Sequence, residues 1–384
     1  MSSTEKLKIY LSIAAISFIQ GLQFCVSPVL GDISAHYPAI DISMVQMLIT
    51  APALLSMAVA LVSGWLVVKI SKKRLLLFAA AWAGILGFLP FLADSFWLLF
   101  LCRTLYGISQ GLATALNVAV VADFFEGEAR VKAMGVQAAS VGAGMVAVTT
   151  IGGLLGAHGF KSAYFINIIG FIAMVVLALC LPELGKVQLK GKEKITLTPE
   201  VFKISAFGFL EFFFLITFTT NIAMHLSGAL AGSSSAAGTL TGIFSGAQIV
   251  IGLVLGTVAG IFKRFTMPTA MVSFAIGTVL LILFPGNFVM LAIGAVFCGL
   301  SQGTFIPTAV TGCSNAVKPA SVAMASAVFT CAMCCGQLVS PLLLNNIAKA
   351  LFSEVTTTNV YIISAIGMAA SAILAFIWKS RSKS

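Results

Sequence analysis

The chain has 384 residues, of which 59% are hydrophobic and only 9% are charged, and its mean hydropathy is +1.07. Soluble domains are about 25% charged, so this composition excludes a soluble fold and predicts a membrane protein. The formal net charge of +10 could suggest nucleic-acid binding. The basic residues are instead spread over short segments between apolar runs, so we expect no nucleic-acid partner.

Apolar runs long enough to cross a bilayer recur along the whole chain. A hydrocarbon core of about 30 Å needs about 20 residues of helix. The runs are continuously apolar, without the alternation of β-barrel strands, and therefore predict helices. We predict an all-α membrane protein with twelve transmembrane helices in two pseudo-symmetric six-helix bundles, with spans at residues 8–30, 42–68, 75–93, 96–121, 133–156, 162–181, 203–225, 238–261, 267–284, 288–312, 320–347 and 359–379.

The distribution of positive charge predicts the orientation of these spans. Nineteen of the 22 Lys and Arg residues lie in one alternate set of seven segments, and two lie in the opposite set. Cytoplasmic loops carry the positive excess, so we expect both termini in the cytoplasm. The short loops and the lack of sorting tails favour a bacterial cytoplasmic (inner) membrane.

The two halves of the sequence resemble each other when shifted by 192 residues. This weak duplication is typical of transporters built from repeats. It predicts an N-terminal bundle at residues 1–181, a cytoplasmic linker at 182–202 and a C-terminal bundle at 203–384. The landmarks that coincide are Gly107-x-Ser109-Gln110-Gly111 with Gly299-x-Ser301-Gln302-Gly303, and Gly144 with Gly336.

Span 1 carries a polar and aromatic face, with Gln20, Gln23 and Phe24 at helical spacing. The turn after span 2 reads Gly64-Trp65-Leu66-Val67-Val68-Lys69-Ile70-Ser71-Lys72-Lys73-Arg74. This turn resembles the signature loop G-x-L-x-D-R-x-G-R-R of the major facilitator superfamily, although Val68 replaces the aspartate and Ser71 a glycine. The resemblance implies a role in conformational gating for Gly64, Lys69, Lys72 and Lys73. The alternative is a basic turn that only sets topology.

Span 4 contains Arg103-x-x-x-Gly107-x-x-x-Gly111, which is similar to an element of the same family. Arg103, Gln110 and Asn117 share one helix face, and an arginine at membrane depth is by default a functional hypothesis. The alternative is an arginine that hydrogen-bonds helix carbonyls. The mixed-charge turn after span 4, which includes Asp123 and Arg130, can pair with the basic turn after span 2.

Span 5 tests the antiporter hypothesis. The family's proton antiporters carry G-x8-G-x3-G-P-x-x-G-G there, and this chain has glycines at 135, 144, 152 and 153 but Val148-Thr149 in place of Gly-Pro. The match is partial, and the loss of the kinking proline weakens the antiporter hypothesis.

Span 7 contains the only carboxylate predicted well inside the membrane, Glu211. Buried carboxyl groups can exchange a proton during a transport cycle, so Glu211 is the candidate proton carrier. A 3.6-residue period places Phe214, Phe218 and Asn221 on its face. Span 10 adds two further candidates, Gln302 and Phe305.

The resemblance implies that spans 1, 4, 7 and 10 line a central cavity that opens to each side in turn. We therefore expect a secondary transporter for a small organic, amphipathic solute, most like the drug/proton antiporter branch, with proton-coupled efflux. The alternative is a symporter or uniporter for a small organic anion, with Arg103 as the anion clamp. A membrane-embedded enzyme and a non-transporting receptor are remote alternatives. We expect a monomer in the lipid bilayer, a proton gradient as energy source, and no cofactor, metal or catalytic residue.

Overall fold

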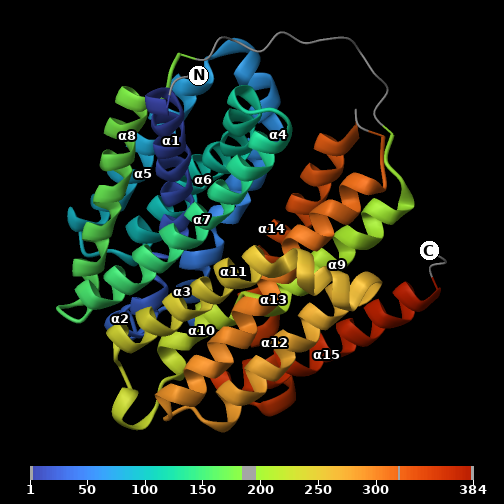
Figure 1. The fold of residues 1–384 in the computed structure, drawn as a ribbon. Helices are drawn as coiled ribbons and strands as arrows, with labels where there is room; N and C mark the ends of the chain where they lie inside the picture. The colour runs from blue at the N-terminus through green and yellow to red at the C-terminus, as the bar shows by residue number, and fades with distance from the viewer. Residues whose placement is uncertain (1–2, 184–195, 319–320, 382–384) are drawn as a thin grey trace. The chain divides into compact units, whose positions relative to one another are not determined.

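The computed structural model describes residues 3–183, 196–318 and 321–381, and every regular element in these ranges is a helix (Figure 1). Eleven segments within the described ranges are long and apolar enough to span a membrane. One of them, Ser234–Leu283, has 50 residues and contains two helices separated at Lys263–Phe265. A single helix of that length would extend about 75 Å, far more than a bilayer, so this segment crosses twice and the prediction of twelve transmembrane helices is confirmed.

The first six spans comprise eight α-helices: α1 (Ser3–Gly21), α2 (Leu30–His36), α3 (Ile42–Thr50), α4 (Pro52–Lys69), α5 (Lys72–Phe88), α6 (Phe96–Phe124), α7 (Gly127–Gly156) and α8 (Ile168–Cys180). The last six comprise α9 (Pro199–Leu215), α10 (Thr217–His225), α11 (Ser234–Phe262), α12 (Thr266–Leu283), α13 (Phe288–Asn315), α14 (Val322–Phe352) and α15 (Thr357–Arg381).

Spans 1, 2 and 7 are interrupted within their length. Span 1 passes from α1 into two short 3₁₀ turns, Leu22–Phe24 and Ser27–Val29, before α2. Span 2 is broken between α3 and α4, where Pro52 begins the second helix and cannot donate an N–H. Span 7 is broken at Ile216, between α9 and α10.

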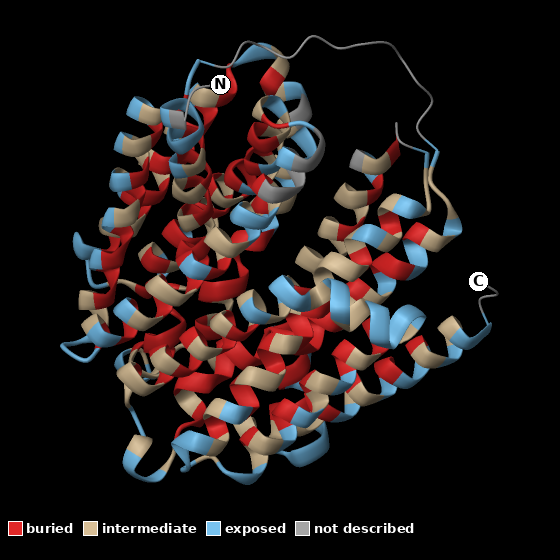
Figure 2. Cartoon of the chain, in the orientation of Figure 1, coloured by how far each residue is buried: buried red, intermediate tan, exposed pale blue. Residues whose placement is uncertain are grey.

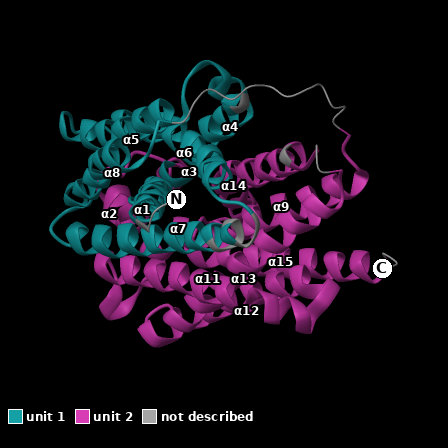
Figure 3. Ribbon diagram, turned by 45° about the horizontal axis from the view of Figure 1, so that its top comes forward, with its two compact units in different colours: residues 1–26, 48–191 teal, residues 27–47, 192–384 magenta. Residues whose placement is uncertain are grey.

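The contacts divide the chain into two compact units (Figure 3). Unit 1 contains residues 1–26 and 48–191, and unit 2 contains residues 27–47 and 192–384. We call residues 27–47 the docking segment, because they pack with unit 2 although the chain on both sides of them belongs to unit 1. The predicted bundle boundaries stay a prediction, and residues 184–195 of the predicted linker lie outside the described residues.

Inside each unit the duplicated sequence produces the same helix contact. In unit 1, α6 packs on α4 so closely that a Cβ atom at Gly107 would lie 2.1 Å from the carbonyl oxygen of Pro52. In unit 2, α13 packs on α11, and a Cβ atom at Gly299 would lie 2.2 Å from the carbonyl oxygen of Phe244. Gly299 and Phe244 each follow their unit 1 counterparts by 192 residues. Only glycine permits this approach of two helix backbones.

Buried and exposed residues alternate along the helices (Figure 2). Many of the exposed residues are large and apolar. Leu92, Leu179 and Leu253 are 79%, 74% and 75% exposed, respectively. Such side chains are stable in lipid, which is as apolar as they are, and the buried faces carry the polar groups. The structural question is therefore which helix each buried polar group contacts.

Candidate solute and coupling site

Glu211 lies in the middle of an apolar helix and is completely buried. Its Oε1 atom accepts a hydrogen bond of 2.7 Å from the Ser301 hydroxyl of α13. Its Oε2 atom has no hydrogen-bond partner within the described residues, and none of the ion pairs found there includes Glu211. The site is therefore a buried carboxyl group with one neutral donor.

The other predicted members of the Glu211 face contact different helices. Phe214 packs against Gly367 of α15, while Phe218 stacks on Phe244 of α11 with ring centroids 4.7 Å apart. Helical periodicity along span 7 indicates which residues share a face, but it does not indicate which neighbouring helix each side chain contacts. Phe305 is also fully buried. A solute-lining role for these three aromatic rings stays a prediction.

Asn221 belongs to a buried amide cluster of unit 2 that the sequence did not reveal. Its Oδ1 atom accepts from Gln46 Nε2 at 2.8 Å, and Gln46 Oε1 accepts from Asn345 Nδ2 at 2.8 Å. Asn345 Nδ2 also donates to Ser43 Oγ at 3.0 Å. The only available signal was the presence of Gln46 and Asn345 inside apolar spans, and nothing in the sequence paired them.

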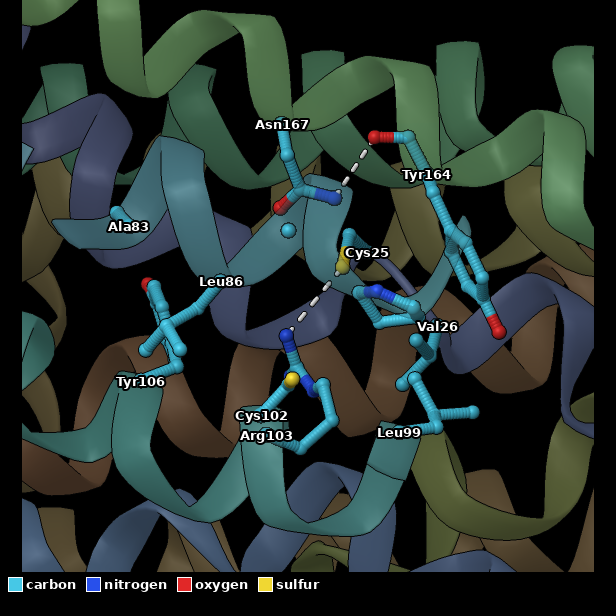
Figure 4. A pocket seen from close by; sticks show the side chains of 12 residues that line it. Cys25, Val26, Ala83, Leu86, Leu99, Cys102, Arg103, Tyr106, Tyr164 and Asn167 are labelled. Atoms are coloured by element: carbon cyan, nitrogen blue, oxygen red, sulfur yellow. Dashed lines mark hydrogen bonds between the residues drawn. The ribbon is translucent and has the colours of Figure 1, made fainter. Parts of the chain in front are cut away.

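Arg103 of α6 is buried in unit 1 and donates to backbone carbonyls. Nε donates to the Leu48 carbonyl at 2.9 Å, Nη1 to the Leu22 carbonyl at 3.2 Å, and Nη2 to the Gln23 carbonyl. Nη1 also lies 3.4 Å from the sulfur of Cys25 (Figure 4). These contacts are of the kind expected from an arginine that binds helix carbonyls.

The amides predicted on spans 1 and 4 lie close together. Gln110 Nε2 donates to Gln23 Oε1, and Gln23 Nε2 donates to the Ile49 carbonyl at 3.1 Å. Asn117 Nδ2 donates to Ser17 Oγ at 2.9 Å. On spans 1 and 4, three amide atoms have no partner within the described part of the chain: Gln20 Nε2, Gln110 Oε1 and Asn117 Oδ1.

Phe24 and Gln302 complete the set of predicted lining residues. Phe24 lies in the 3₁₀ turn after α1 and is partly exposed. Gln302 repeats Gln110 in sequence but contacts a different span, because its Oε1 atom accepts from Gln248 Nε2 of α11 at 2.9 Å. Spatial equivalence in the duplication is thus kept for the glycines and lost for this amide.

A small cavity of unit 1 lies beside Arg103 (Figure 4). Cys25, Cys102, Tyr106 and Asn167 contribute to its lining. The Tyr106 hydroxyl donates to the Ile19 carbonyl, and Asn167 Nδ2 donates to the Tyr164 carbonyl at 2.8 Å. The Tyr106 hydroxyl and the Asn167 amide are therefore already hydrogen-bonded to backbone carbonyls. In the described ranges no group of three His, Cys, Asp or Glu side chains could hold a metal ion.

The basic turn after span 2 makes specific contacts with other helices of unit 1. Lys72 pairs with Asp123 at the end of α6 at 2.5 Å, the pairing expected from the mixed-charge turn. Lys73 donates to the Ala178 and Leu181 carbonyls at the end of α8, at 2.9 and 2.6 Å. Lys69 stacks over the Trp65 ring at 3.9 Å. A gating role stays a prediction, and the side-chain environments at Gly64 and Arg130 lie outside the described part.

Twelve apolar spans, a duplicated glycine scaffold and isolated polar groups at membrane depth define a polytopic transport protein. Residues 11–207 and 204–384 match the sequence profile of the Major Facilitator Superfamily. The chain therefore belongs to that family and is a secondary transporter of its type.

Solved structures of transporters share the fold at low sequence identity. A peptide transporter of the POT family, described as auto-inhibited, is 11% identical, with a TM-score of 0.80 over 98% of this chain and 97% of its own. A mutant of the nucleoside transporter NupG is 14% identical, with a TM-score of 0.74 over 96% and 99%. A bacterial homologue of the human lysosomal transporter Spinster is 15% identical, with a TM-score of 0.71 over 99% and 96%. At these identities the likeness concerns the fold alone.

Proposed function

We propose that this protein is a proton-coupled antiporter that exports a small amphipathic organic solute by alternating access, as in the drug/proton antiporter branch. The membrane is the bacterial cytoplasmic membrane, and the proton gradient is the energy source. One observation carries the proposal: Glu211 is a fully buried carboxyl group whose second oxygen has no partner.

The charged form of Glu211 is unfavourable in its buried position. An isolated carboxylate is costly away from water, whereas the neutral acid needs only hydrogen-bond partners. Ser301 can donate to the carboxylate, or accept from the acid when its own hydroxyl rotates, so it serves both forms. A proton can therefore bind and leave at Glu211 as the site alternates between buried and hydrated states.

The surrounding groups favour an amphipathic solute over an anion. The candidate residues are aromatic rings and neutral amides, which contact apolar and hydrogen-bonding groups. The anion hypothesis needs a free guanidinium, but Nε, Nη1 and Nη2 of Arg103 all donate to backbone carbonyls. An anion would have to displace those bonds.

The test uses purified protein in liposomes that contain a pH-sensitive dye. With an acidic interior, addition of a lipophilic cation or a neutral amphipathic compound is expected to drive proton release coupled to solute uptake. Glu211→Gln is expected to abolish uphill solute movement and retain solute exchange at equal concentrations, because the amide preserves size and loses the titratable proton.

Three outcomes would overturn the proposal. Uphill transport by Glu211→Gln would remove Glu211 as the carrier. Accumulation of organic anions together with protons would favour the symporter hypothesis. Solute movement only down its own concentration gradient would favour the uniporter hypothesis.

A further inference from the structure

The docking segment joins unit 1 at two places, and both are interrupted helices. The chain leaves unit 1 after Val26, within the 3₁₀ turns that follow α1. It returns at Leu48, three residues before the break between α3 and α4. We call these places the first and second joints.

Backbone carbonyls at the joints lack their normal helical partners. In an α-helix the carbonyl of one residue accepts from the N–H four residues later. For Leu48 that residue is Pro52, which has no N–H. At the first joint, the only backbone N–H of the described residues that donates to the Leu22 carbonyl is that of Cys25, at 3.2 Å. The helical partner of the Gln23 carbonyl would be the N–H of Ser27, but the α-helix ends before Ser27.

Arg103 supplies the missing donors at both joints. Its three nitrogens reach the Leu22 and Gln23 carbonyls at the first joint and the Leu48 carbonyl at the second. Arg103 is buried, with an exposed fraction of only 6%. A planar group with five donors can bind carbonyls from two directions, which a lysine ammonium cannot reproduce.

The docking segment is held to unit 2 by separate bonds. Ser27 Oγ donates to the Thr219 carbonyl at 2.6 Å, and Gln46 bonds both Asn221 and Asn345. The docking segment is therefore hydrogen-bonded to the rest of unit 2 near both of its ends, while Arg103 hydrogen-bonds residues that precede and follow the segment.

The repeat in unit 2 provides an internal comparison. The residues 192 positions after Pro52 and Arg103 are Phe244 and Ala295. Helix α11 runs without interruption through Phe244, from Ser234 to Phe262. The proline, the arginine and the break of span 2 thus occur together in unit 1 and are all absent at the equivalent positions of unit 2, whereas span 7, the counterpart of span 1, is also interrupted, at Ile216.

We infer that Arg103 is a positioning residue: it stabilises the two joints at which the docking segment meets unit 1, and it does not bind the solute. This inference is independent of proton coupling, because its main readout is the backbone of the joints.

The test combines Arg103→Gln with Pro52→Ala. The glutamine avoids an unpaired buried charge but offers donors from one nitrogen only. We expect hydrogen exchange at residues 22–27 and 48–54 to accelerate at least about tenfold, transport to fall about tenfold, and solute affinity to change less than about threefold. Pro52→Ala restores an N–H opposite the Leu48 carbonyl, so the double variant is expected to recover a substantial part of both losses.

Pro28→Ala is the matched control. It also lies at a joint, but the carbonyl four residues before it belongs to Phe24, which Arg103 does not bind. It is expected to give no recovery.

Loss of solute affinity in Arg103→Gln with unchanged hydrogen exchange at the joints would overturn the inference, as would equal recovery by both alanine substitutions. If Arg103→Gln alone does not fold, the yield of folded double variant decides: recovery supports the inference and no recovery contradicts it. Loss of proton coupling by Glu211→Gln has no bearing on either result.

Discussion

Units 1 and 2 share a packing scaffold and differ in the polar groups placed on it. In both units a glycine of the fourth helix of the repeat meets a backbone carbonyl of the second, at Gly107 and Pro52 in unit 1 and at Gly299 and Phe244 in unit 2. The next glycine repeats the contact, with Gly111 on Ser56 and Gly303 on Gln248. These close approaches constrain the residue type in both copies.

The same comparison shows where the two copies diverged. Ser109 and Ser301 occupy equivalent positions, yet Ser301 donates to Glu211 while the Ser109 hydroxyl has no partner in the described residues. The residue equivalent to Glu211 in unit 1 is Ile19, and the residue equivalent to Arg103 in unit 2 is Ala295. Unit 1 thus contains the buried Arg103 and unit 2 the buried Glu211. A duplicated scaffold leaves such positions free to specialise, because the glycine contacts do not depend on them.

The largest effect should come from breaking the shared scaffold. Gly107→Ala and Gly299→Ala each place a Cβ atom within 2.3 Å of a carbonyl oxygen, at 2.1 and 2.2 Å, so the helices must separate. We expect a loss of about 1–3 kcal/mol or more for each, measured as a lower unfolding temperature in detergent. Gly246→Ala, where a Cβ atom meets nothing within 4 Å, is the control. If one glycine variant is as stable as the control, the two units do not share the constraint.

Alanine substitutions at the two equivalent serines should have a smaller effect, a loss of transport at Ser301 but not at Ser109. Ser301→Ala removes the one neutral donor to Glu211, and hydrogen bonds to charged groups are worth about 1.5–3 kcal/mol, so we expect uphill transport to slow about tenfold or more. Ser109→Ala removes a hydroxyl without a partner and should transport normally. Rates in the same liposomes make the comparison, and equal losses would show that Ser301 acts only through packing.

Substitution in the amide cluster of unit 2 should have the next largest effect. Asn345→Ala leaves Gln46 Oε1 and Ser43 without their shared donor, and we expect a loss of about 1–2 kcal/mol in unfolding free energy. The neighbouring Asn346 is exposed and bonds only the Leu342 carbonyl of its own helix, so Asn346→Ala is the control. Hydrogen exchange in the docking segment should rise in the first variant alone. A rise in both would point to a general effect on α14.

The ion pair at the end of α6 should have the smallest effect. Lys72 and Asp123 are paired in unit 1, whereas the equivalent residues in unit 2 are Arg264 and Asn315. The side chains of Lys72 and Asp123 are 8% and 30% exposed, respectively, and an asparagine oxygen at position 123 can still accept a hydrogen bond from Lys72. Asp123→Asn should therefore lower stability by only about 1 kcal/mol, and by less at high salt. Unfolding temperatures at low and high salt test this. A large salt-independent loss would assign the carboxylate a role beyond pairing with Lys72.

The sequence predicted the spans well because the bilayer imposes one length and one polarity on every helix. It also indicated Glu211 and Arg103, since ionisable residues at membrane depth are rare. It could not identify their partners. The contact between Glu211 and Ser301 joins residues 90 positions apart, and the amide cluster joins Gln46 to Asn345, 299 positions apart.

Helical periodicity alone did not indicate which helix each side chain of span 7 contacts. It grouped Phe214 and Phe218 with Glu211, but the three side chains contact α15, α11 and α13, respectively. The break at Ile216 has no proline to announce it. The break at Pro52 could have been expected from its missing N–H, but not the arginine that replaces this donor.

The sequence by itself determined the class of this protein, its twelve spans and its duplicated glycine scaffold, because hydropathy and close backbone packing depend on local residue type. Only the tertiary structure decided which polar groups meet. Hydrogen bonds form between atoms brought together by packing, and in this chain that packing joined Arg103 to two broken helices, Glu211 to a serine, and residues 27–47 to unit 2.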